Sequence, residues 1–96
     1  MILHILTKAP DSRAATQMQQ ALGNQDSVLL IEEAVTAALN PAWAAWQKYR
    51  SRIFLLSEDL TSRGLTHIAA KHQLPTMDVD DFVALTEQYE KTVTWY

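Results

Sequence analysis

The sequence predicts an α/β domain in three layers, with helices on both faces of a mostly parallel five-stranded sheet. Two observations lead to this fold class. Short aliphatic runs alternate with longer segments of helical periodicity, and such an order requires crossover connections between parallel strands. The aliphatic runs also lack alternation of polar and apolar residues, as expected of strands that are covered on both faces. With 96 residues, the chain is expected to form one domain, 1–96.

Five segments are expected to be strands. Three of them are nearly continuous in Ile, Leu, Val or Phe: Ile2–Leu6, Ser27–Ile31 and Arg52–Leu56. Two are weaker, Thr76–Val79 and Thr92–Tyr96. The last is β-branched and aromatic, which suits a strand at or near an edge of the sheet.

Helices are expected between the strands. Residues 12–22 place five apolar side chains on one face, with Asp11 as the predicted N-cap and Gly23 as the stop signal. Residues 32–39 form a second amphipathic segment. Asn40 and Pro41 then predict a helix start with proline at the first helical position.

Two later helices are predicted from their capping residues. Ser57 is expected to cap a helix that has two acids in its first turn and ends at Gly64. Asp78 and Asp81 have near-capping-box spacing and start the last helix, whose apolar period continues to Tyr89.

The composition excludes several kinds of chemistry. The chain has no cysteine, so it has no thiol, and its two glycines cannot form a phosphate-binding loop. Eight basic and eleven acidic residues, without a basic cluster, argue against direct binding of nucleic acid. No apolar run approaches the ~20 residues of a membrane span, and the N-terminus does not resemble a signal peptide. We therefore expect a cytoplasmic protein that does not bind a membrane.

The histidines do not predict a metal site. His67 and His72 would lie on different faces of a helix, and their spacing does not match a ligand set. His4 lies within the first strand and is expected to be a hydrogen-bonded core or interface residue. We therefore predict no metal and no cofactor.

Acidic residues follow two of the predicted strands. Glu32 and Glu33 come after the second strand, and Glu58 and Asp59 come after the third. Ligands of open α/β sheets bind at the C-terminal ends of strands, so these acids are candidate site residues. The alternative is that they stabilise the N-termini of helices.

Aromatic residues are the candidates for a subunit interface. Trp43, Trp46 and Tyr49 share one face of a short predicted helix, and Trp95 and Tyr96 follow in the last strand. Trp and Tyr are enriched at interfaces because they combine a large contact area with a polar group. We predict a partner interface at Trp43, Trp46, Trp95 and Tyr96, with core packing as the alternative for the helical residues.

Four ordered stretches resemble one family, the DsrH/TusB proteins of bacterial sulfur relays. They are Leu3–Leu6 with Pro10, Val28–Leu39, Leu55–Leu65 and Asp81–Thr86, followed by Trp95. The third is the most similar, because it contains Glu-Asp-Leu-x-x-Arg-Gly at Glu58–Gly64. The resemblance covers essentially the whole chain.

This resemblance implies an α/β/α domain that assembles with TusC-like and TusD-like subunits into a heterohexamer. Such complexes pass persulfide sulfur toward 2-thiolation of the tRNA wobble uridine, and the accepting cysteine lies on the TusD-like subunit. DsrH-type members often carry a cysteine near the first helix, where this chain has Thr16–Gln20. The missing cysteine favours the TusB branch and a subunit that is not an enzyme and has no catalytic residue of its own.

Two alternatives remain open at this point. One is a stand-alone, homo-oligomeric domain that binds a ligand at Glu32–Glu33 and Glu58–Asp59. The other is a DsrEFH-type subunit of sulfur oxidation.

Overall fold

The computed structural model describes residues 1–96 and confirms an α/β fold whose five-stranded sheet is parallel throughout. The strand order is β4-β3-β2-β1-β5. The strands are β1 Ile2–Leu6, β2 Ser27–Leu30, β3 Ile53–Leu56, β4 Thr76–Met77 and β5 Lys91–Trp95. Strand β2 is therefore central, β1 lies between β2 and β5, and the last strand forms an edge.

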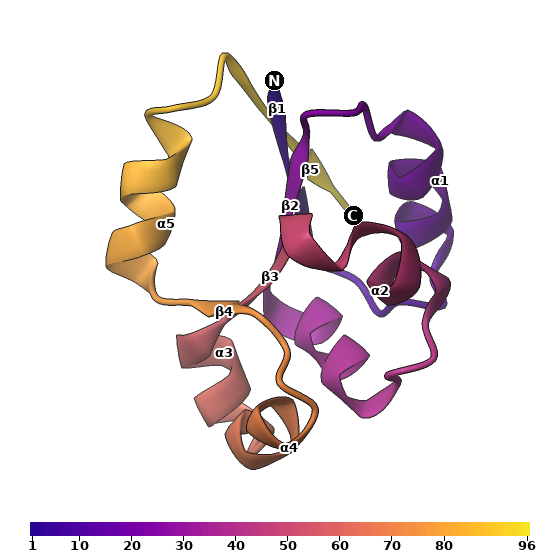
Figure 1. Ribbon diagram of the computed structural model, residues 1–96, viewed down its shortest axis with the longest axis vertical. Helices are drawn as coiled ribbons and strands as arrows, with labels where there is room; N and C mark the ends of the chain where they lie inside the picture. Colours follow the sequence, from indigo (N-terminus) through magenta and orange to yellow (C-terminus); the bar gives the residue numbers. More distant parts are fainter.

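Helical segments connect the strands and lie on both sides of the sheet (Figure 1). They are α1 Arg13–Ala21, the 3₁₀ segment η1 Glu32–Leu39, α2 Ala44–Tyr49, the 3₁₀ turn η2 Arg50–Arg52, α3 Ser57–Ser62, α4 Thr66–Lys71 and α5 Val79–Thr86. In Figure 1, α1 and α2 lie on one side of the sheet and α5 lies on the other. The predicted three layers are confirmed.

Helix caps differ from the predicted ones in two places. The N-cap of α1 is Ser12 rather than Asp11, because the Ser12 hydroxyl accepts a hydrogen bond from the Ala15 amide at 3.1 Å. Ser57 does not cap α3. Strand β3 passes directly into this helix, so Ser57 is already its first helical residue and Leu56 occupies the cap position. The cap at Asp78 is confirmed by its bond from the Asp81 amide at 2.8 Å.

The segment after β2 is the largest departure from the predicted secondary structure. Residues 32–39 form a 3₁₀ helix rather than an α-helix. Asn40 and Pro41 do not start α2. A turn closed by the bond from the Trp43 amide to the Asn40 carbonyl intervenes, and α2 begins at Ala44.

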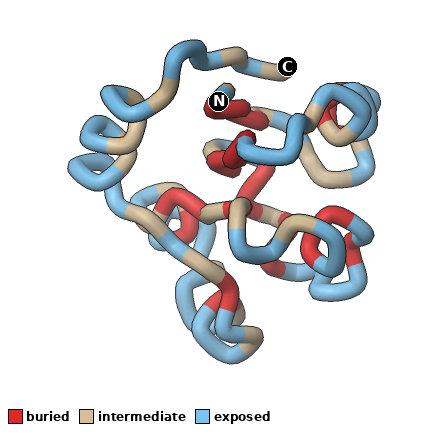
Figure 2. The backbone as a smooth tube through the Cα atoms, turned by 45° about the horizontal axis from the view of Figure 1, so that its top comes forward, coloured by how far each residue is buried: buried red, intermediate tan, exposed pale blue.

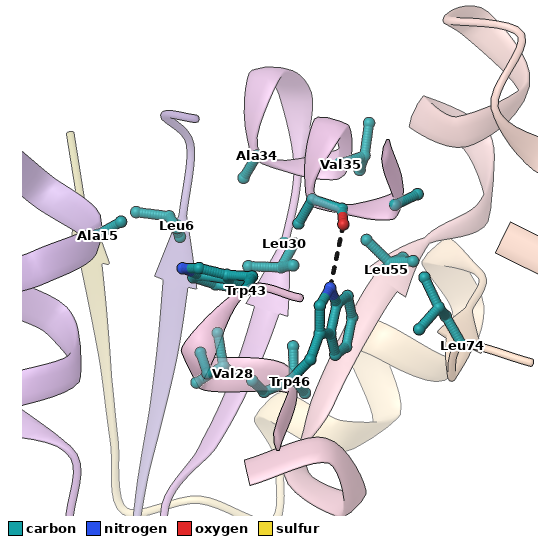
Figure 3. Close-up of a cluster of buried hydrophobic side chains, with 14 of the residues drawn as sticks. Leu6, Ala15, Val28, Leu30, Ala34, Val35, Trp43, Trp46, Leu55 and Leu74 are labelled. Atoms are coloured by element: carbon teal, nitrogen blue, oxygen red, sulfur yellow. Dashed lines mark hydrogen bonds between the residues drawn. The ribbon is translucent and has the colours of Figure 1, made fainter. Parts of the chain in front are cut away.

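The main core lies on the face of the sheet that is covered by α1, η1 and α2. It is a cluster of 18 buried residues, which includes Trp43 and Trp46. The two indoles meet edge to face, with 5.9 Å between ring centroids and 88° between planes. The Trp46 indole N–H donates to the Ala37 carbonyl at 3.0 Å, which ties α2 to η1 (Figure 3).

The opposite face is covered more thinly. Helix α5 contains no buried residue, and Figure 2 shows it in pale blue and tan. Leu3 and Leu29 are nevertheless buried, as expected of strands in the middle of a parallel sheet.

Candidate functional site

The acids at the strand ends bind backbone amides of the chain itself. Asp59 accepts a hydrogen bond from the Glu32 amide at 2.6 Å, and Glu32 has a left-handed backbone with φ of 53°. Glu58 accepts from the Val79 amide at 3.2 Å, at the start of α5. Glu33 is exposed on the first turn of η1. Glu58 and Asp59 therefore connect neighbouring crossovers in this structure.

The most buried polar residue is His4, at the middle of the interior strand β1. Its Nε2 lies 2.9 Å from Oδ2 of Asp26, the residue that precedes β2. Its Nδ1 accepts a hydrogen bond from the Trp95 indole N–H at 3.0 Å. His4 thus links three neighbouring strands, and the prediction of a hydrogen-bonded core histidine is confirmed.

The two partners fix the protonation of His4. The Trp95 indole N–H can only donate, so Nδ1 of His4 carries a lone pair. The Asp26 carboxylate can only accept, so Nε2 carries the proton. The imidazole is therefore a neutral Nε2–H tautomer, and both of its nitrogens are used inside the fold.

Asp26 is a buried carboxylate with a full set of donors. Its Oδ1 accepts from the Ile2 amide at 2.9 Å, and its Oδ2 accepts from the Gly23 amide at 2.8 Å as well as from His4. Burial raises the pKa of Asp26. The hydrogen bonds from His4, Gly23 and Ile2 outweigh burial, so the pKa lies below its ordinary value of 3.8. Asp26 therefore stays ionised at neutral pH and joins the starts of β1 and β2.

Sequence reasoning missed the role of Asp26. The available signal was a histidine inside an otherwise aliphatic strand, since a buried polar group requires a partner. An acid immediately before the next strand was the nearest candidate. Glycine also leaves room at position 23, because a Cβ there would lie 3.2 Å from Asp26 Oδ2 and crowd the carboxylate.

The four aromatic candidates fall into two groups. Trp43 and Trp46 are 7% and 1% exposed, so they pack inside the chain, which is the core-packing alternative. Trp95 is half-buried against the core, and Tyr96 is 81% exposed. The surface near the end of β5 thus presents the two aromatic side chains that a partner could reach.

One small cavity lies between α3, α4 and β4. Its volume is about 190 Å³, and its lining combines hydroxyl and aliphatic groups from Ser57, Leu60, Thr61, Thr66, Ala70, Leu74 and Thr76. None of these side chains is charged. No three His, Asp or Glu side chains lie together as metal ligands do.

These features define a small α/β/α domain whose buried polar groups hold its own sheet together. A model of the family described as "DsrH like protein" matches residues 8–92, so the chain belongs to the DsrH-like family. "Protein TusB" of Escherichia coli O1:K1 / APEC is 30% identical over 96 residues, which cover 98% of this chain and 100% of the relative. "Protein TusB" of Shigella boydii serotype 18 (strain CDC 3083-94 / BS512) gives the same values.

Family membership suggests a subunit of a sulfur relay, and members of this family are generally non-catalytic. The chain contains no cysteine. None of its helices is both long and apolar enough to cross a membrane.

Proposed function

We propose that the chain is a non-catalytic subunit of a TusBCD-type sulfur-relay complex that supports 2-thiolation of the tRNA wobble uridine. The observation that carries this proposal is the full-length similarity to TusB proteins in a chain that lacks cysteine. A persulfide forms on a thiol, so the sulfur in transit resides on a partner and not on this chain. The partners are TusC-like and TusD-like subunits, and tRNA is not contacted directly.

The contacts of the polar residues support a structural role. His4 and Asp26 bond to each other and to neighbouring strands. Glu58 and Asp59 bond to backbone amides. These groups are used in maintaining the fold, which is what a scaffold-like subunit requires.

The partner surface is proposed to include Trp95 and Tyr96. Tyr96 is 81% exposed, and large exposed aromatic side chains are characteristic of binding surfaces. Trp43 and Trp46 contribute indirectly, because their burial positions α2 and η1 around the core.

Co-expression with TusC-like and TusD-like subunits tests the assembly. We expect the three chains to elute together on size exclusion, and Tyr96→Ala to weaken the complex. Leu39→Ala is the matched control, since Leu39 is also an exposed apolar residue, at the end of η1. If this chain elutes alone with both partners present, the proposal is wrong.

A second measurement tests the role in thiolation. The gene is introduced into a bacterium that lacks its own TusB, and 2-thiouridine in tRNA is measured by retardation in mercury-containing gels. We expect thiolation to be restored when the partner genes are supplied with this one. Assembly without restored thiolation would retain the subunit role and reject the tRNA role.

A further inference from the structure

The two edges of the sheet differ in length. Strand β4 forms one edge with only two residues, Thr76 and Met77. Strand β5 forms the other edge with five residues, Lys91–Trp95, and pairs only with β1. Proteins commonly protect long edges with proline, bulges or several charges, but β5 has neither proline nor a bulge, and Lys91 is its only charge.

The unpaired backbone groups of β5 belong to Thr92 and Thr94. The Trp95 carbonyl accepts from the Thr7 amide at 3.2 Å, so Trp95 faces β1. In a parallel pair, alternate residues bond to the neighbouring strand, so Lys91 and Val93 also face β1. Thr92 and Thr94 therefore direct their N–H and C=O groups away from the sheet.

The edge is also held in one conformation. The Trp95 indole is bonded to His4, and the Thr7 hydroxyl donates to the Trp95 carbonyl at 3.1 Å. All five residues of β5 are in register with residues 2–6 of β1. A partner strand would therefore meet an ordered template and would not have to order it on binding.

We propose that β5 pairs antiparallel with β5 of a second copy of this chain, about a two-fold axis at Val93. The outward-facing residues, Thr92 and Thr94, lie symmetrically on either side of Val93. The axis therefore places Thr92 opposite Thr94 of the second copy, and each such pair exchanges two hydrogen bonds. Every outward backbone group of the strand is used, and two five-stranded sheets become one.

The side chains are self-complementary in the same register. Thr92 and Thr94 are exposed, and cross-strand Thr–Thr pairs are favourable. On the other face, Val93 meets its own copy. Lys91 lies opposite Trp95 of the second copy, where an ammonium group over an indole is attracted by the ring. No like charges are brought opposite each other within the five residues.

The symmetry also limits the assembly. A two-fold contact uses the same patch on both copies and closes after two, whereas joining β5 to β4 would continue without end. The pairing needs no other subunit, so it is tested on this chain alone, without the proposed relay partners.

The test is the mass of the purified chain in solution, measured by light scattering and sedimentation over a range of concentrations. We expect a reversible dimer. Thr94→Pro should give a monomer, because the ring removes the outward N–H while the bonds to β1 remain. Thr94→Val is the matched control and should dimerise, since it keeps the N–H and the β-branched shape. Circular dichroism of each variant checks the fold.

Charge variants make the test independent of proline. Thr92→Lys/Thr94→Lys and Thr92→Glu/Thr94→Glu should each be monomeric, and their mixture should dimerise, because unlike charges then lie opposite each other. Hydrogen exchange should be slowed at the amides of residues 92 and 94 in the dimer only. A wild-type chain that is monomeric at all concentrations overturns the proposal. So does a dimer that Thr94→Pro leaves intact. A monomer whose binding to TusC-like or TusD-like subunits is lost in Thr94→Pro would assign the edge to a partner strand instead.

Discussion

The two faces of the sheet are packed very differently. One is covered by α1, η1 and α2, and its cluster of 18 buried residues includes two tryptophans. The other is covered by α5, where Phe82 and Leu85 are only half-buried and Val83 is 53% exposed. The comparison indicates that most of the apolar stabilisation lies on the first face. Regions with few buried contacts open most readily, so α5 is expected to open before the rest of the fold.

The largest expected effect is on the first face. Trp46→Ala removes a side chain that is 1% exposed, together with the bond to the Ala37 carbonyl. We expect the free energy of unfolding to fall by about 3–5 kcal/mol, which would unfold much of the population. Urea denaturation followed by circular dichroism measures it. Tyr96→Ala is the control and should change stability by less than about 0.5 kcal/mol. Equal effects of the two substitutions would contradict the comparison.

A smaller effect is expected at Asp26, which joins the strands on this same side. The two carboxylate oxygens of Asp26 accept hydrogen bonds from three donors, and Asp26→Asn removes the charge and replaces one of these oxygens with an NH₂ group. We therefore expect the free energy of unfolding to fall by about 1–3 kcal/mol at pH 7.

The loss should depend on pH. The pKa of Asp26 is lowered in the folded chain, so its carboxylate stabilises the fold above the ordinary value of 3.8. This contribution is lost as the pH falls through the folded pKa. The stability of wild type and Asp26→Asn should therefore converge below about pH 4. Parallel stability profiles from neutral to acidic pH would show that Asp26 is not ionised in the fold.

The smallest effect is expected on the second face. Phe82→Ala should lower the free energy of unfolding by about 1 kcal/mol. Truncation of a fully buried Phe costs about 3–5 kcal/mol, but the Phe82 ring is only half-buried. Hydrogen exchange should speed up in α5 and remain unchanged in β1 and β2. Val83→Ala, at an exposed position of the same helix, is the matched control. A global loss as large as that of Trp46→Ala would mean that the two faces contribute equally.

Local patterns predicted the strands well. Aliphatic runs placed β1, β2 and β3 within a residue or so, because burial on both faces imposes an apolar residue at nearly every position. The predicted helix starts differed more from the structure. Asn40-Pro41 has the chemistry of a helix start, but Trp43 must reach the core first, and the helix begins only after it.

The candidate site depended on contacts that a local pattern does not contain. Glu58 meets the Val79 amide, and Asp26 meets His4, across 21 and 22 positions of sequence. Such pairs arise only when crossovers bring the strands together. Trp46 can likewise be buried because its indole N–H finds an acceptor in the Ala37 carbonyl of η1.

The pairing of β1 with β5 also has a consequence for synthesis. Residues 2–6 form an interior strand, yet one of the two strands beside it is residues 91–95. Nearly the whole chain must leave the ribosome before this strand is covered on both sides, and pairing over so long a separation is slow. Nδ1 of His4 therefore lacks its hydrogen-bond donor, the Trp95 indole, until translation is nearly finished. Until β5 is synthesised, the aliphatic strand β1 has an unpaired edge, and chaperones that bind extended apolar segments are expected to recognise it.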